Sequence, residues 1–239
     1  MPFGRVRPGG LMDCKISIII PVWNEASVIN RTLDHIFTLP YGGAVEIIVV
    51  DGHPEGKTIN EIRQRRVDRM ISEKGRANQM NAGARRAGGD VLLFLHADTM
   101  LPENALASIA GVIETGRHVG GAFDLGIESE RMVFRLIERA ASLRSRLTRI
   151  PYGDQAIFIR RDYFAEMNGF REIPIMEDMD IMRRIKKRGD AIHIIPARVK
   201  TSARRWEKEG ILSCTLRNWM MAGLYLLGIS PERLCRFYP

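Results

Sequence analysis

The stretch DVLLFLHADT, residues 90–99, indicates the class of fold. Its apolar run 91–95 follows a glycine pair and is too short for a membrane helix, which is typical of a strand buried on both faces of a parallel sheet. His96 and Asp98 follow at the carboxyl end of this strand, the edge at which open α/β sheets bind ligands. Alternate residues of an extended segment project to one side, so both side chains are expected to point into the same crevice.

An imidazole and a carboxylate at this edge could bind a divalent cation that neutralises a diphosphate. The alternative is an ordinary polar strand-to-helix turn, in which Asp98 caps a helix that Pro102 opens. Taken alone, the strand favours the ordinary polar turn, because strand-to-helix turns are commonly polar, and the rest of the chain changes that balance.

Strands and helices alternate along the first half of the chain. The apolar runs predict strands over residues 16–20, 45–50, 67–71 and 91–95. Helical spacing predicts helices over residues 25–37, 76–87 and 102–115. This order predicts an α/β fold with a doubly wound, mostly parallel central sheet.

The second half is expected to continue the same domain with a mixed sheet and to supply the other wall of the cleft. Its predicted strands cover residues 120–125, 155–159 and 191–195. Its predicted helices cover residues 130–147 and 179–188, the second of which Gly189 ends. C-terminal helices complete the predicted fold.

Composition is that of an ordinary globular protein with a partner that carries phosphate. The chain has 239 residues, 45% hydrophobic and 27% charged, which is ordinary for a globular enzyme with a full core. Its net charge of +8 suggests a nucleotide, nucleic acid or anionic lipid as partner. No basic tract is interleaved with aromatic residues, so we expect no nucleic-acid partner.

Cysteine usage indicates a reducing compartment. Cys14, Cys214 and Cys235 are odd in number and far apart, which disfavours both a disulfide framework and a zinc site. Residues 1–14 contain no apolar run, so they are predicted to form a flexible tail rather than a signal peptide. We therefore expect a cytoplasmic protein.

The C-terminal segment 207–239 is predicted to be helical and amphipathic. Its apolar stretch, residues 211–228, is interrupted by Arg217 and Asn218 and does not reach the ~20 residues that a transmembrane helix needs. The apolar side of this helix could pack on the domain, form a homodimer, or lie peripherally on the inner face of the membrane. Packing on the domain is the interpretation that we favour.

Polar residues end three of the predicted parallel strands, and they should meet at one edge of the sheet. Glu25 follows the first strand, Asp51 the second and Asp98 the fourth. A carboxylate such as Asp51 can accept a hydrogen bond from the N–H of a nucleobase, and Glu25 can accept one from a ribose hydroxyl. The alternative is that Asn24 and Glu25 cap the following helix. Trp23, in the same turn, is interpreted as a packing residue, although its place beside this motif leaves stacking on a sugar open. This turn contains no glycine, which argues against a nicotinamide dehydrogenase.

Six short motifs occur in a characteristic order. They are PVWNE (21–25), DG (51–52), GRANQMNAG (75–83), HAD (96–98), MEDMD (176–180) and RRW (204–206). Together they resemble the inverting family 2 glycosyltransferases, which have the GT-A fold, and the expected GT-A domain covers residues 15–206. Within that family the chain most resembles small bacterial members named for arsenosugar biosynthesis.

The resemblance implies a site for a nucleoside-diphosphate sugar, UDP- or GDP-linked. Pro21, Glu25 and Asp51 would hold the nucleoside. Arg76 would approach the nucleotide or its phosphates.

The resemblance also implies a metal cofactor, Mg²⁺ or Mn²⁺, which Asp98 would ligate where it bridges the diphosphate. His96 replaces the first aspartate of the family's metal motif, and a neutral imidazole suits Mn²⁺ better than Mg²⁺. His96 is therefore the weaker metal candidate and could contact sugar or phosphate instead. Arg205 and Trp206 would flank the diphosphate and the acceptor.

Asp178 is implied as the general base of the transfer. Asp178 and Glu177 are adjacent, and neighbouring residues of a helix diverge by ~100°, so only one of them can face the reaction while the other holds an N–H or an arginine. We choose Asp178. The alternative is that both only supply negative charge to a first helical turn. On the acceptor side the resemblance implies Asp154 and Gln155, which otherwise form a simple turn.

We therefore predict an inverting, metal-assisted glycosyltransferase whose acceptor the sequence does not identify. One alternative is a nucleotidyltransferase that makes a nucleotide-sugar, but that class usually opens with a glycine-rich phosphate loop, which the turn 21–25 lacks. The other alternative is a catalytically silent nucleotide-sugar-binding module, which would need no base at Asp178.

Overall fold

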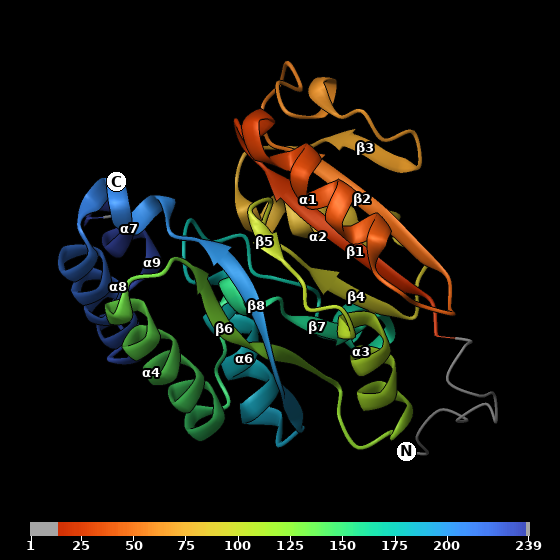
Figure 1. Cartoon of the computed structure of the whole chain (residues 1–239). Coiled ribbons are helices and arrows are strands. Elements are labelled where there is room, and N and C mark those ends of the chain that lie inside the picture. The colour runs from red at the N-terminus through yellow and green to blue at the C-terminus, as the bar shows by residue number, and fades with distance from the viewer. Residues whose placement is uncertain (1–13, 238–239) are drawn as a thin grey trace.

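The computed structural model describes residues 14–237, so the tail predicted over residues 1–14 lies almost wholly outside the described residues. Eight strands of the described chain form one mixed sheet in the order β3-β2-β1-β4-β7-β6-β8-β5 (Figure 1). The strands are β1 (Ile16–Val22), β2 (Val45–Asp51), β3 (Val67–Ile71), β4 (Val91–Phe94), β5 (Thr99–Met100), β6 (Gly120–Glu128), β7 (Phe158–Arg160) and β8 (Ile192–Ser202).

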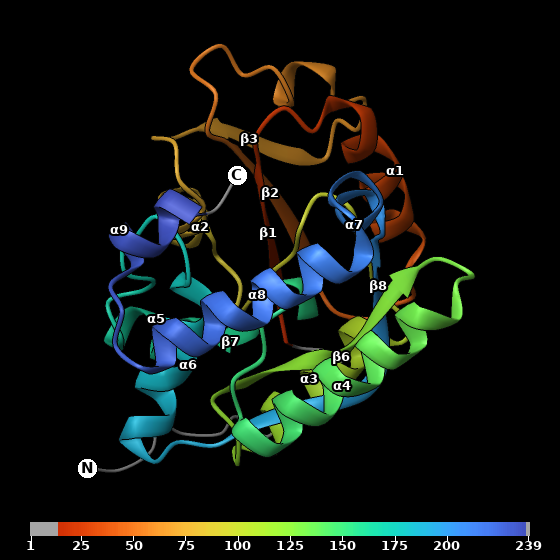
Figure 2. The ribbon, with the colours of Figure 1, turned by 90° about the vertical axis from the view of Figure 1, so that its left-hand side faces the viewer.

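Helices cover both faces of this sheet, as Figures 1 and 2 show. On one face α1 (Ala26–Thr38) and α3 (Ala105–Glu114) pack on side chains of β1, β2 and β4. On the other face lie α2 (Arg76–Arg86), α5 (Arg161–Glu166), α6 (Glu177–Arg188) and part of α8 (Ile211–Leu226). The remaining helices are α4 (Met132–Thr148), α7 (Arg204–Glu209) and α9 (Pro231–Leu234). This arrangement confirms the predicted α/β architecture.

The first four strands run parallel and bring their carboxyl ends to one edge. Val22 of β1 lies opposite Asp51 of β2, and Ile19 of β1 lies opposite Phe94 of β4. Strands β1, β2 and β4 are largely buried because their apolar residues face helices on both sides, whereas β3 at the sheet edge is mostly exposed or half-buried. The residues that follow them are therefore gathered at the same end of the sheet, as the sequence predicted.

The second half departs from the predicted boundaries. Strand β7 begins at Phe158 rather than at residue 155, because Gly153–Gln155 form a 3-10 helix. Strand β8 runs to Ser202, well beyond the predicted end at residue 195, and pairs in parallel with β6 across a register shift after Phe123. Strand β7 joins the two halves through antiparallel pairs with β4 and β6.

Neither of the two alternatives that invoked helix capping agrees with the structure. Asn24 has a left-handed backbone with φ of 55°, and neither it nor Glu25 makes a side-chain cap to α1. The helix after β4 begins at Ala105, too far along the chain for Asp98 to cap it, because Thr99 and Met100 first pair with β8. Glu25 and Asp98 both bond to Arg204 instead.

Gln79 ties the ends of two strands together, and this contact predicts an effect on stability. Its buried Nε2 donates to the carbonyl oxygens of Val22 at 2.7 Å and of Val50 at 2.8 Å. Replacing Gln79 by alanine is expected to lower the free energy of unfolding by about 2 kcal/mol, because each lost buried bond is worth ~1 kcal/mol. Urea denaturation measures this, with Gln64→Ala as control because the Gln64 side chain bonds an exposed carboxylate. Equal losses in both variants would contradict the role given to Gln79.

Candidate active site

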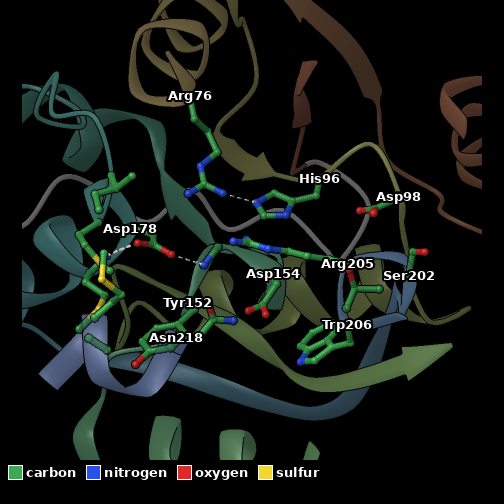
Figure 3. Close-up of a pocket in the computed structure, with 17 residues that line it drawn as sticks. Arg76, His96, Asp98, Tyr152, Asp154, Asp178, Ser202, Arg205, Trp206 and Asn218 are labelled. Atoms are coloured by element: carbon green, nitrogen blue, oxygen red, sulfur yellow. Dashed lines mark hydrogen bonds between the residues drawn. The ribbon is translucent and has the colours of Figure 1, made fainter. Parts of the chain in front are cut away.

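Two connected cavities lie at the carboxyl edge of β1 and β4. The large cavity, of about 880 Å³, lies over the ends of β1 and β4, the start of α2, and α7. The small cavity, of about 200 Å³, lies between the segment 152–154, the start of α6, and helices α7 and α8 (Figure 3). Their shared lining residues are Arg76, His96, Asp98, Ile175 and Arg205. The two cavities are therefore adjacent and share one wall.

His96 and Asp98 line both cavities, in agreement with the expectation that they point into one crevice. The His96 Nε2 lies 3.4 Å from Nη1 of Arg76. Burial, together with the charge of Arg76, lowers the pKa of His96 to about 3, so its imidazole is neutral and accepts this contact. Burial raises the pKa of Asp98, while Arg204 opposes that shift.

The two neighbouring carboxylates at the start of α6 point in different directions. Glu177 is buried and forms an ion pair with Nε of Arg76. Asp178 lines the small cavity and accepts hydrogen bonds from the backbone N–H of Gly153 at 2.6 Å and of Met179 at 2.7 Å. In Figure 3, Asp178 and Asp98 lie on opposite sides of the cavity, with Arg76 and His96 between them. Of the two carboxylates, only Asp178 faces the small cavity.

Of the two residues predicted on the acceptor side, Asp154 and Gln155, only Asp154 lines a cavity. Asp154 lines the small cavity, and burial, together with the nearby charge of Asp178, raises its pKa to about 6 despite the opposing charge of Arg144. Gln155 is fully buried and does not line either cavity. Its amide accepts from Ser145 at 2.7 Å and donates to the Phe123 carbonyl at 2.8 Å, so Gln155 holds the loop in place instead of facing an acceptor.

Asp51 lies at the predicted edge but faces away from the cavity. Its carboxylate is fully buried and accepts backbone N–H groups of His53 at 2.8 Å, Thr58 at 2.7 Å and Ile59 at 3.2 Å. In this structure Asp51 therefore organises the loop after β2 and does not line either cavity. Pro21, by contrast, lines the large cavity as predicted.

Trp23 and Arg204 both line the large cavity, although the sequence favoured packing for Trp23 and gave Arg204 no separate role. Trp23 is 37% exposed, and the Lys74 Nζ lies 4.4 Å from its ring centroid, so its ring is not buried in the core. Arg204 bonds Glu25 at 2.9 Å and Asp98 at 3.4 Å. The aromatic residue in PVWNE and the doubled arginine in RRW were the only signals for them.

The pair Arg205 and Trp206 lies where the two cavities meet α7. Arg205 lines both cavities, and its Nε lies 3.3 Å from Glu209. Trp206 lines the small cavity with its edge, donates from Nε1 to Thr215 at 3.2 Å, and packs edge-on against Phe134. Trp206 therefore fixes α7 and α8 against the sheet and forms part of the cavity wall.

The residues present suit a metal that is held jointly with a phosphate ligand. Within residues 14–237 no three His, Cys, Asp or Glu side chains lie close enough to hold a metal ion by themselves. Mg²⁺ is usually bound by one or two carboxylates together with substrate phosphates, so Asp98, with His96 as a second donor, fits an ion completed by a diphosphate.

The sequence also matches a known family. Residues 17–171 match the profile described as "Glycosyl transferase family 2", which is well over half of the chain. The chain belongs to this family. Among curated family 2 relatives, the "Dolichol-phosphate mannosyltransferase" of Pyrococcus furiosus is 27% identical over 143 residues, covering 56% of this chain and 41% of the relative. The "Probable glycosyltransferase YdaM" of Bacillus subtilis is 25% identical over 220 residues, covering 82% of this chain and 51% of the relative. The chain thus spans about half the length of these relatives, or less.

Solved structures with the same fold confirm the GT-A class. The mannosyltransferase PcManGT from Pyrobaculum calidifontis, in complex with GDP-Man and Mn²⁺, aligns with a TM-score of 0.58 at 19% identity, covering 84% of this chain and 60% of that one. Residues 1–349 of TarS from S. aureus, in complex with UDP-GlcNAc, align with a TM-score of 0.59 at 16% identity, covering 79% and 58%. At these identities the likeness shows the fold alone.

Proposed function

We propose that this family 2 chain is an inverting glycosyltransferase that moves a sugar from a UDP- or GDP-linked donor to an acceptor hydroxyl with the help of Mg²⁺ or Mn²⁺. The observation that supports it most is that Asp98 and Asp178 line the same small cavity from separate elements. A carboxylate for the diphosphate side and another for the acceptor side are what this reaction requires. When bound, the metal would neutralise charge on the departing diphosphate.

In this proposal the large cavity takes the nucleotide. Pro21 and Glu25 line it beside the exposed ring of Trp23, which offers a flat apolar surface for a base. Asp51 contributes through the loop that it holds. PcManGT binds GDP-Man with Mn²⁺ and TarS binds UDP-GlcNAc, which supports a nucleotide-sugar donor here.

The positive side chains shared by the two cavities would contact the phosphates. Arg76 and Arg205 both lie at the junction of the cavities. The ion pair with buried Glu177 holds the Arg76 guanidinium there, so Glu177 acts as a positioning residue. Preorganised guanidinium groups stabilise the charge that develops on a leaving diphosphate.

The small cavity would then take the acceptor. Asp178 accepts the proton of the attacking hydroxyl, while the two backbone N–H groups bonded to it hold its carboxylate in place. Asp154, in the same cavity, would contact the acceptor or the sugar. Attack on the face opposite the leaving group inverts the anomeric centre.

A thermal-shift screen of nucleoside diphosphates tests this function. A diphosphate present at about 100 times its Kd, with Mn²⁺, should add ~2.7 kcal/mol to the stability of the native state. For a domain of this size the melting temperature should rise by roughly 5–10 °C. The same diphosphate with a chelator in place of Mn²⁺ is the control. If no nucleoside diphosphate raises the melting temperature beyond this control, the proposal is wrong.

The finer predictions remain part of the proposal. The resemblance to members named for arsenosugar biosynthesis does not specify an acceptor. A cytoplasmic location, and contact of the C-terminal segment with a membrane or a second copy, also stay predictions. No helix between residues 14 and 237 combines the length and apolar character that crossing a bilayer demands.

A further inference from the structure

Exposed large apolar side chains gather on two helices. Of the 15 that are exposed within the described residues, nine lie on α4 and α8. They are Met132, Leu136, Leu143 and Leu147 on α4, and Leu212, Leu216, Trp219, Met220 and Leu226 on α8. Apolar surface concentrated in this way marks an interaction site more often than scattered apolar residues do.

On each helix these residues form a stripe. At ~100° per residue, the four on α4 fall within an arc of roughly 60°, and the five on α8 within roughly 120°. The buried residues of the two helices, such as Phe134 and Glu138 on α4 and Cys214 and Met221 on α8, lie on the opposite sides. Each helix therefore has one side that packs on the domain and an opposite apolar side that faces outward.

The two helices lie side by side on one surface of the molecule. Figure 2 shows α4 and α8 both facing the viewer, and Figure 1 shows the same two helices together at one side. A shared cluster that includes Phe134, Trp206 and Cys214 packs between them. The two stripes therefore belong to one surface, which we call the α4–α8 face and define by the nine residues named above.

The charge around this face is positive. Between residues 130 and 149 the chain has six arginines and two acidic residues, the exposed Glu130 and Glu138, which is buried and paired with Arg135. Arg139 is exposed and falls on the flank of the α4 stripe. Arg131 and Arg149, at the two ends of α4, are also exposed. Guanidinium groups beside an apolar stripe complement the phosphates and acyl chains of an anionic bilayer.

A second copy of the chain is a poorer partner for the same face. A two-fold contact is self-complementary, so it would bring two arginine-rich rims together across the interface. Like charges that face each other in this way cost free energy unless acidic residues intervene. The arginines of the stretch 130–149 outnumber its acidic residues, which are the buried Glu138 and the exposed Glu130.

We propose that the α4–α8 face binds the surface of an anionic lipid bilayer. The two helices lie in the plane of the interface, the apolar stripes enter the acyl-chain boundary, and the flanking arginines meet lipid phosphates. The contact is peripheral, and it holds whether or not the chain transfers sugar.

Vesicle co-sedimentation of the full chain tests this surface. The protein is expected to sediment with vesicles of phosphatidylglycerol and phosphatidylcholine in equal parts, and to stay in the supernatant with phosphatidylcholine alone. The double variant Leu216→Glu/Trp219→Glu should bind at least about tenfold more weakly, because two carboxylates replace inserted apolar groups. Arg139→Gln should weaken binding by about fivefold, which corresponds to one arginine near an anionic surface.

The matched control is Phe37→Glu/Ile71→Glu, which makes the same change at two exposed apolar residues outside α4 and α8. This control should bind vesicles as the unmodified protein does, and far-ultraviolet circular dichroism shows whether each variant is folded. Absence of binding to the anionic vesicles, or equal weakening in the control, overturns the proposal. A dimer in analytical ultracentrifugation that only Leu216→Glu/Trp219→Glu dissociates would assign the face to a second copy instead.

Discussion

Replacing Asp98 by asparagine is expected to abolish the metal-dependent part of nucleoside diphosphate binding. Asp98 is the one carboxylate that lines both cavities, and Asn removes its charge with little change in shape. Because metal and donor would be held together at this residue, the transfer rate should fall by ~10²–10³ as well. Titration calorimetry of UDP and GDP, with and without Mn²⁺, measures the binding.

The control for this variant is Asp162→Asn. Asp162 is exposed and pairs with Arg160, away from both cavities. It should bind as the unmodified protein does. Metal-dependent affinity that survives in Asp98→Asn would show that the diphosphate is held elsewhere.

Replacing Asp178 by asparagine is expected to separate binding from transfer. Asn at this position can still accept the N–H of Gly153 or Met179 through its carbonyl oxygen, but it cannot accept the proton of a hydroxyl. The rate of transfer should fall by ~10²–10⁴ while the affinity for the donor stays the same. Donor binding by calorimetry and turnover under saturating donor distinguish the two effects.

Two neighbouring carboxylates provide the comparison. Glu177→Gln removes the ion pair that holds Arg76, so it should raise the KM for the donor more than it lowers kcat. Asp154, with a pKa of about 6, would serve as a base only above that pH, so a rate limb near pH 6 that vanishes in Asp154→Asn would give it the role. Full turnover by Asp178→Asn together with that result would replace Asp178 by Asp154.

The first half of the fold was predictable because its signals are local. Strands β1, β2 and β4 consist mainly of apolar residues, and the bounds of β3 match the prediction. The second half of the fold was less predictable. Strand β8 alternates buried and exposed residues past Pro196, and β5 consists of only two residues. Elements of that kind form through pairing with distant strands, which short-range patterns do not show.

The site followed the same division. His96, Asp98 and Asp178 line one cavity. Their common location could be predicted because His96 and Asp98 follow a predicted strand and Asp178 lies at the start of a predicted helix. Asp51 and Gln155 were expected at the ligand and instead face inward, because local loops use their oxygens. The pairing of Arg204 with Glu25 spans 179 positions in the chain, a separation for which a single sequence carries no signal.

The two sides of helix α8 face different surroundings, the small cavity on one side and the outer surface on the other. Asn218, Met221 and Ala222 form one wall of the small cavity, while Leu216 and Trp219 lie on the outer surface. Protein interiors have low compressibility and transmit strain. A partner that displaced α8 from outside would therefore also change the shape of the small cavity, because the same helix forms its wall.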